Sequence, residues 1–236
     1  MRSPLDELIL AILSQNTTDV NSLAAFRRLK NRFPQWHALL SATYKEVLDT
    51  IKTAGLGPTK TRRILDLLPQ VRQIDPDLTM DFVCSMSLEK GYEFLTSFNG
   101  VGAKTAACVL LFACGKPAFP VDTHVFRVAR RIGLDHASRT REQSGVATPL
   151  PWPKDHAPRT REQSGMATPL PWAKDHASRT RQQMQRFLEQ AVPEDDRYNL
   201  HMNLIRLGRE VCLARAPRCG RCFLQDVCEH HLHQGS

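Results

Sequence analysis

Four closely spaced cysteines near the C-terminus constrain how the last part of this chain can fold. They are Cys212, Cys219, Cys222 and Cys228, which form a C-x6-C-x2-C-x5-C run. Four sulfur donors in so short a segment can reach one metal centre only if the backbone between them wraps around it. A zinc knuckle or disulfides are the alternatives. Zinc sites more often pair two short C-x2–4-C hooks, and only Cys219 and Cys222 form such a hook here.

The other three cysteines are Cys84, Cys108 and Cys114, and their spacing suits no metal site. Because Cys108 and Cys114 lie in apolar helical sequence, we expect these cysteines to be buried packing thiols. With seven cysteines in all and no leader sequence, a disulfide framework is not expected.

The composition favours a nucleic-acid partner without identifying one. The chain has 236 residues, with 32 Lys and Arg against 24 Asp and Glu, a net charge of +8 and a pI near 9.3. This charge attracts polyanions through counterion release. The segment Met1–Glu7 lacks the apolar core of a signal peptide, and no apolar run reaches about 18 residues. We therefore expect a cytoplasmic protein without membrane association.

Apolar residues recur at helical spacing along most of the chain, and strand-like alternation is essentially absent. The pattern predicts an all-α protein of about ten helices. The expected helices cover residues 5–13, 20–29, 42–53, 58–68, 88–98, 104–113, 123–132, 184–192 and 198–212.

One segment departs from the helical pattern. Residues 136–155 are followed by a near copy, 156–175, and a third copy starts at His176 and dissolves after Arg181. A segment rich in Pro, Ser, Thr and Arg buries little apolar surface, so a solenoid is not expected. We interpret residues 136–175 as an insertion between two helices, either a tolerated surface loop or an auxiliary DNA or partner contact. The second interpretation would use Arg139, Arg141, Arg159, Arg161, Trp152 and Trp172.

Two glycines at Gly100 and Gly102 separate two predicted helices, in a pattern typical of a helix-hairpin-helix over residues 95–111. Glycines let backbone N–H groups approach a phosphate, and the N-terminus of the next helix adds positive charge. A plain helix–helix turn is the alternative. Lys104 follows in the first turn, where the helix dipole and partial burial favour the free amine needed for nucleophilic attack. Asp122 is predicted as the N-cap of the helix beginning at Thr123.

The hairpin, the eighteen-residue spacing from Lys104 to Asp122 and the cysteine run together resemble the endonuclease III family of DNA repair glycosylases. Asn99 departs from the proline usual in that family. Relative to the family, the start is short of the helix that precedes Leu5, which would either weaken the cluster domain or mean that the recorded start is late. The resemblance implies a two-domain helix-hairpin-helix glycosylase fold. A helical barrel domain would span residues 1–116 and a C-terminal iron–sulfur cluster domain residues 117–236, interrupted at 136–175.

The resemblance also implies a function. The chain would be a bifunctional DNA glycosylase and AP lyase that removes damaged bases, oxidised pyrimidines as the family expectation, and nicks the strand. Lys104 and Asp122 would be catalytic and face each other across a cleft. The four C-terminal cysteines would bind a [4Fe–4S] cluster.

The resemblance further implies that the protein is a monomer. Its partner would be double-stranded DNA that carries a damaged base or an abasic site. The implied DNA-binding residues are Gln15, Asn16, Leu56, Gly100, Gly102, His124, Arg215 and Arg218. Two alternatives stay open. One is a monofunctional glycosylase of the same superfamily, against which Lys104 argues, and the other is a noncatalytic DNA-binding or redox-sensing iron–sulfur protein.

Overall fold

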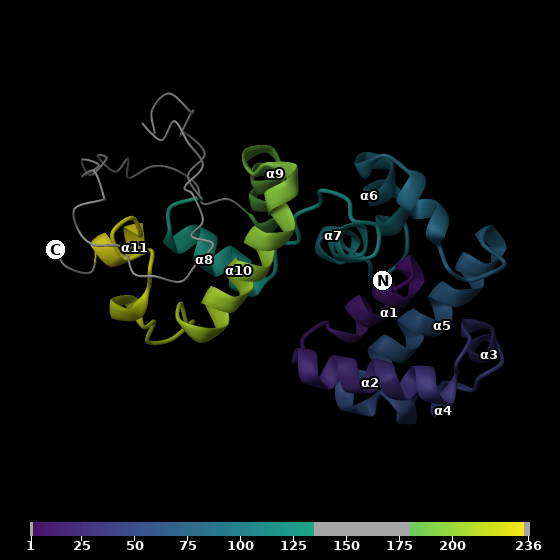
Figure 1. The fold of residues 1–236 in the computed structure, drawn as a ribbon. Helices are drawn as coiled ribbons and strands as arrows, with labels where there is room; N and C mark the ends of the chain where they lie inside the picture. Colours follow the sequence, from purple (N-terminus) through teal and green to yellow (C-terminus); the bar gives the residue numbers. More distant parts are fainter. Residues whose placement is uncertain (1, 135–179, 234–236) are drawn as a thin grey trace. The chain divides into compact units, whose positions relative to one another are not determined.

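The computed structural model describes residues 2–134 and 180–233, and these residues form helices and connecting turns with no strand (Figure 1). The predicted all-α class is therefore confirmed. No helix in the described ranges is long and apolar enough to cross a membrane. The helices are α1 (Pro4–Leu13), α2 (Asp19–Arg32), α3 (Trp36–Leu40), α4 (Tyr44–Ile51), α5 (Gly57–Ile74), α6 (Leu88–Thr96), α7 (Ala103–Phe112), α8 (Thr123–Arg131), α9 (Arg181–Ala191), α10 (Arg197–Glu210) and α11 (Glu229–Leu232).

The chain divides into two compact units. The N-terminal unit comprises residues 1–120 and 185–201, and the C-terminal unit comprises residues 121–184 and 202–236. The chain thus leaves the N-terminal unit after α7 and returns to it in α9. The division into domains after residue 116 stays a prediction. The repeat at 136–175 lies outside the described residues, so both interpretations of it stay predictions as well.

Helix α7 of the N-terminal unit packs against α1 and α6 (Figure 1). It is buried from Thr105 to Leu111, because its sequence is apolar on every side. Helix α1 is almost entirely buried too and begins at Pro4, whose fixed φ suits the first helical position. The side chain of Ser3 caps this helix by accepting a hydrogen bond from the N–H of Asp6 at 3.2 Å.

Polar contacts explain why residues 185–201 belong to the N-terminal unit. The Glu189 carboxylate accepts hydrogen bonds from the Tyr92 hydroxyl and, at 3.0 Å, from the backbone N–H of Phe119. The buried Arg197 guanidinium donates to the carbonyl of Pro117. Hydrogen bonds that involve a charged group are roughly twice as strong as neutral ones, so these contacts fix the segment that precedes Asp122.

Helix positions agree with the predictions except at a few ends. Helix α5 runs six residues past the predicted end at Leu68 and contains Pro69. The buried side chains of Leu68 and Val71 anchor the helix on both sides of this proline. The short helices α3 and α11 were not predicted, because five- and four-residue segments are too short to show a periodic pattern.

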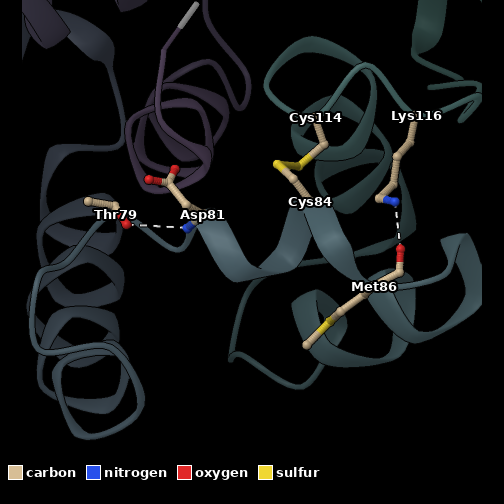
Figure 2. The surroundings of a disulfide bond; sticks show 6 residues. All are labelled: Thr79, Asp81, Cys84, Met86, Cys114 and Lys116. Atoms are coloured by element: carbon tan, nitrogen blue, oxygen red, sulfur yellow. Dashed lines mark hydrogen bonds between the residues drawn. A yellow bond between two sulfur atoms is a disulfide. The ribbon is translucent and has the colours of Figure 1, made fainter.

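The prediction that Cys108 and Cys114 are packing thiols is wrong for Cys114. Cys84 and Cys114 form a disulfide, with their Cα atoms 4.8 Å apart (Figure 2). Cys84 lies in a 3₁₀ helix, η2 (Asp81–Ser85), and Cys114 lies just after α7. Nearby, the Lys116 ammonium donates to the carbonyl of Met86. Thirty residues separate the two cysteines, so only the tertiary fold brings them together. Cys108 is buried, as predicted.

Candidate functional site

The turn between α6 and α7 has the backbone geometry expected of a phosphate-binding hairpin. Gly100 has a φ of +81°, a left-handed conformation that favours glycine. Gly102 is exposed and precedes α7 without a side-chain cap, and a Cβ atom placed on it would meet nothing within 4 Å. The first N–H groups of α7 therefore end at an open surface, where an anion is favoured by the helix dipole.

Lys104 is the second residue of α7 and is half-buried. The buried carboxylate of Glu7, on α1, lies within its electrostatic reach. Burial raises the pKa of Glu7, while the charges of Arg2 and Lys104 oppose this rise. Glu7 also forms a 3.1 Å ion pair with Arg2. Lys104 thus comes directly after the exposed hairpin, and its charge acts on a carboxylate that is already paired with Arg2.

Asp122 caps α8 as predicted. Its Oδ1 atom accepts hydrogen bonds of 2.8 Å from the backbone N–H groups of both His124 and Val125. These two bonds hold the side chain in place at the positive end of the helix. Lys104 belongs to the N-terminal unit and Asp122 to the C-terminal unit, so their catalytic pairing stays a prediction.

Two surface loops carry the other predicted DNA contacts of the N-terminal unit. Asn16 is exposed and has a φ of +52°, while Leu56 is 53% exposed and has a φ of +49°. A left-handed conformation costs a residue such as leucine about 1–2 kcal/mol, so the loop at Leu56 is held in strained geometry, whereas asparagine tolerates this conformation. Gln15 instead turns inward, where its Nε2 donates to the carbonyl of Gly100 at 3.3 Å.

The four C-terminal cysteines line one pocket in the C-terminal unit. Burial raises the pKa values of the Cys222 and Cys228 thiols, and the charges of the neighbouring thiolates raise them further. Four sulfur donors whose thiolate forms would repel one another suit a site that binds a cationic centre. Within residues 2–134 and 180–233, no three metal-ligating side chains converge closely enough to bind a single ion. Four cysteines around one pocket are a donor set that fits an iron–sulfur cluster, in which each iron takes its own cysteine.

Two arginines of α8 support the cysteine loop and were not predicted from the sequence. Arg127 donates from Nε to the carbonyl of Cys212 at 3.0 Å and lies 3.2 Å from Nδ1 of His124. Arg131, one turn later, donates to the sulfur of Cys212. Arg127 and Arg131 are four residues apart and therefore lie on one helix face. This spacing is the feature of the sequence that could have indicated their shared role. The predicted DNA contacts Arg215 and Arg218 are exposed on the loop that follows Cys212.

A pocket of the N-terminal unit lies near the C-terminal end of α7. It is lined by Phe112, Lys116 and Tyr198 among others. Lys104, at the N-terminal end of α7, does not line this pocket, although Glu7 and Arg2 do.

Two family models match the chain. Residues 9–153 match the HhH-GPD superfamily of base excision DNA repair proteins, and residues 212–228 match the iron–sulfur binding domain of endonuclease III. The second match begins and ends on the first and last cysteine of the run. The predicted [4Fe–4S] cofactor is thereby confirmed.

Individual proteins agree with these matches. Endonuclease III of Sulfolobus acidocaldarius is 28% identical over 233 residues, which cover 98% of this chain and 84% of that protein. An Arabidopsis thaliana protein named as a candidate DNA glycosylase is 40% identical over 131 residues, covering 56% of this chain but only 45% of the plant protein. A solved structure of endonuclease III trapped in a covalent intermediate with DNA superposes with a TM-score of 0.71 at 23% identity, covering 100% of this chain and 88% of that one. The chain belongs to the HhH-GPD superfamily of base excision DNA repair proteins and, within it, is similar to endonuclease III.

Proposed function

We propose that the chain is a bifunctional DNA glycosylase and AP lyase. Its substrate would be double-stranded DNA with a damaged base, an oxidised pyrimidine in the first instance, or an abasic site. The observation that carries the proposal is the position of Lys104 in the first turn of α7, directly after the exposed, uncapped hairpin at Gly102. A phosphate bound at this hairpin brings the neighbouring deoxyribose within reach of an amine.

The chemistry follows from this amine. After the damaged base is flipped out of the duplex, Nζ of Lys104 attacks C1′ of the deoxyribose and the base departs with the glycosidic electron pair. The Asp122 carboxylate, held by its two backbone hydrogen bonds, stabilises the positive charge that develops on the sugar or assists proton transfer. Opening of the sugar ring leaves a Schiff base between Lys104 and C1′. The iminium acidifies the C2′ hydrogens, so loss of one proton expels the 3′ phosphate by β-elimination.

Other residues would hold the distorted DNA. The exposed side chain of Leu56 is suited to wedge between stacked bases, and Asn16 to occupy the space that the flipped base leaves. Arg215 and Arg218 would bind phosphates, and His124 would add a contact beside Asp122. Cys212, Cys219, Cys222 and Cys228 would hold the cluster, which when bound fixes the shape of the loop bearing these arginines.

Borohydride trapping on a duplex with one abasic site tests the proposal. Native protein loaded with its cluster should form a covalent adduct that Lys104→Gln does not form. Lys90→Gln is the matched control, because Lys90 is exposed on α6. An adduct that persists in Lys104→Gln would assign the nucleophile to another residue. Base release without an adduct would favour a monofunctional glycosylase, and DNA binding without base release a noncatalytic protein.

A further inference from the structure

A lysine is fully buried beneath the two loops that carry Asn16 and Leu56. Lys60, on the first turns of α5, is 1% exposed, and its Nζ donates hydrogen bonds of 2.7 Å to the carbonyls of Leu13 and Ala54. Leu13 is the last residue of α1, and Ala54 is the last residue of the 3₁₀ turn η1 (Lys52–Ala54). One ammonium therefore joins two chain segments that are far apart in sequence.

The loops that carry Asn16 and Leu56 begin directly after the two bound carbonyls. Asn16 lies three residues after Leu13, and Leu56 lies two residues after Ala54. Both residues have left-handed backbone conformations. Strained conformations persist only where the surrounding structure fixes them, and the two hydrogen bonds from Lys60 fix the start of each loop.

A second cation on the same helix extends this connection to the hairpin. Arg63 is one turn after Lys60 and donates to Oε1 of Gln15, whose Nε2 donates to the carbonyl of Gly100 at 3.3 Å. The Arg63 side chain also covers Gly100 so closely that a Cβ atom there would collide with it. Both ends of the Gln15 amide are therefore occupied, which leaves Asn16 as the exposed member of the pair.

We infer that Lys60 and Arg63 are positioning residues that set the geometry of the three DNA-facing loops, at Asn16, Leu56 and Gly100. The DNA-facing role of these loops rests on the proposed function, whereas the connection between them is a property of the fold. Gln15 acts within this connection rather than as a base contact. A misplacement of about 1 Å at such a site can slow catalysis about a hundredfold, so the connection matters for base flipping.

Hydrogen exchange tests the connection without any reaction. In Arg63→Met, backbone amides of residues 14–17 and 99–102 should exchange roughly tenfold faster, while amides of residues 54–57 should stay at the native rate. Lys60→Met should instead accelerate residues 14–17 and 54–57. Arg62→Met is the matched control, because Arg62 is exposed on the same helix and carries the same charge. Equal exchange in Arg63→Met and Arg62→Met would overturn the inference.

Single-turnover base release on lesion-containing DNA tests the consequence. Arg63→Met should release the base at least about tenfold more slowly than Arg62→Met, with equal affinity of the two variants for undamaged duplex. Arg63→Lys should recover part of the rate, because it keeps a cationic donor. Equal rates in the two methionine variants would overturn the positioning role in catalysis. If native protein releases no base and traps no abasic DNA, the proposed function fails, while the exchange pattern still decides the connection.

Discussion

Arg131 donates a hydrogen bond from Nη1 to the Sγ atom of Cys212, over 3.3 Å. The same guanidinium donates to the carbonyls of Leu213 at 2.6 Å and Ala214 at 3.1 Å, and its backbone carbonyl accepts from the Cys228 thiol at 3.4 Å. A single residue of α8 thus contacts the first and last cysteines of the run and the basic loop between them. Hydrogen bonds to cluster sulfurs are one of the ways in which a protein sets a reduction potential.

We expect Arg131→Met to lower the reduction potential of the cluster and to speed its loss in air. A cationic donor stabilises the more negative, reduced cluster, so its removal favours the oxidised form. Voltammetry measures the potential, and the visible absorbance of the cluster over time measures its loss. Arg206→Met is the control, because Arg206 is exposed on α10 and pairs with Glu210. A potential and a rate of loss equal to those of Arg206→Met would contradict this role.

The two roles of Asp122 can be separated by substitution. Asn is as good an N-cap as Asp, so Asp122→Asn should keep the free energy of unfolding within about 0.5 kcal/mol of native. If the carboxylate is catalytic, base release should nevertheless fall about a hundredfold or more. Asp122→Ala should lose both the cap, at a cost of about 1 kcal/mol, and the activity. Denaturant titration and single-turnover kinetics provide the two values. Full activity in Asp122→Asn would mean that the carboxylate is not needed for catalysis and that Asp122 acts only as the N-cap of α8.

Leu56→Gly should leave stability unchanged or raise it by up to about 1 kcal/mol, because glycine relieves the left-handed strain at an exposed position. Base release from duplex DNA should slow, since the apolar wedge is lost. Leu78 provides the contrast, with a φ of +54° but only 2% exposure. Leu78→Gly should cost about 2–4 kcal/mol through lost packing. Thermal unfolding that ranks the two variants equally would contradict this interpretation.

Local and distant interactions explain what the sequence could predict. The helices, the hairpin glycines and the Asp122 cap depend on residues a few positions apart, so their patterns are visible in the sequence. Lys60 is 47 residues from Leu13, Arg131 is 81 residues from Cys212, and Cys84 is 30 residues from Cys114. Such partners are chosen by packing of distant segments, and a lone Lys, Arg or Cys carries no local sign of them. The four clustered cysteines could be recognised as one site from the sequence, because they are close to one another in the chain.

The disulfide should make stability depend on reductant. Closing a loop of about 30 residues stabilises a fold by roughly 3–4 kcal/mol in the chain-entropy model. Cys84→Ala should lose this amount relative to oxidised native protein, and reductant should lower native stability toward that of the variant. Cys108→Ala is the control, because Cys108 is buried outside the disulfide and its variant should keep the reductant dependence. Urea unfolding with and without a phosphine reductant measures the effect. An unfolding free energy of the native protein that is the same with and without reductant would contradict a stabilising role of the disulfide.

Lys60 should give the stability of the chain a distinct dependence on pH. Burial, with a smaller contribution from the charge of Arg63, lowers the pKa of Lys60 to about 8 in the folded chain. An unfolded lysine has a pKa near 10.4, so between about pH 8 and pH 10 the unfolded chain binds the extra proton. The free energy of unfolding therefore rises with pH in this window, by at most about 1.4 kcal/mol per pH unit from this group.

The comparison with Lys60→Met isolates this effect, because all other titrating groups are shared. The difference in unfolding free energy, native minus variant, should increase from pH 8 to pH 10 and be constant below pH 7. Urea titrations at pH 6, 7, 8, 9 and 10 measure it. A difference that stays flat up to pH 10 would mean that the carbonyls of Leu13 and Ala54 keep the buried ammonium charged. In that case the two hydrogen bonds outweigh desolvation, and the connection between the loops would persist at alkaline pH.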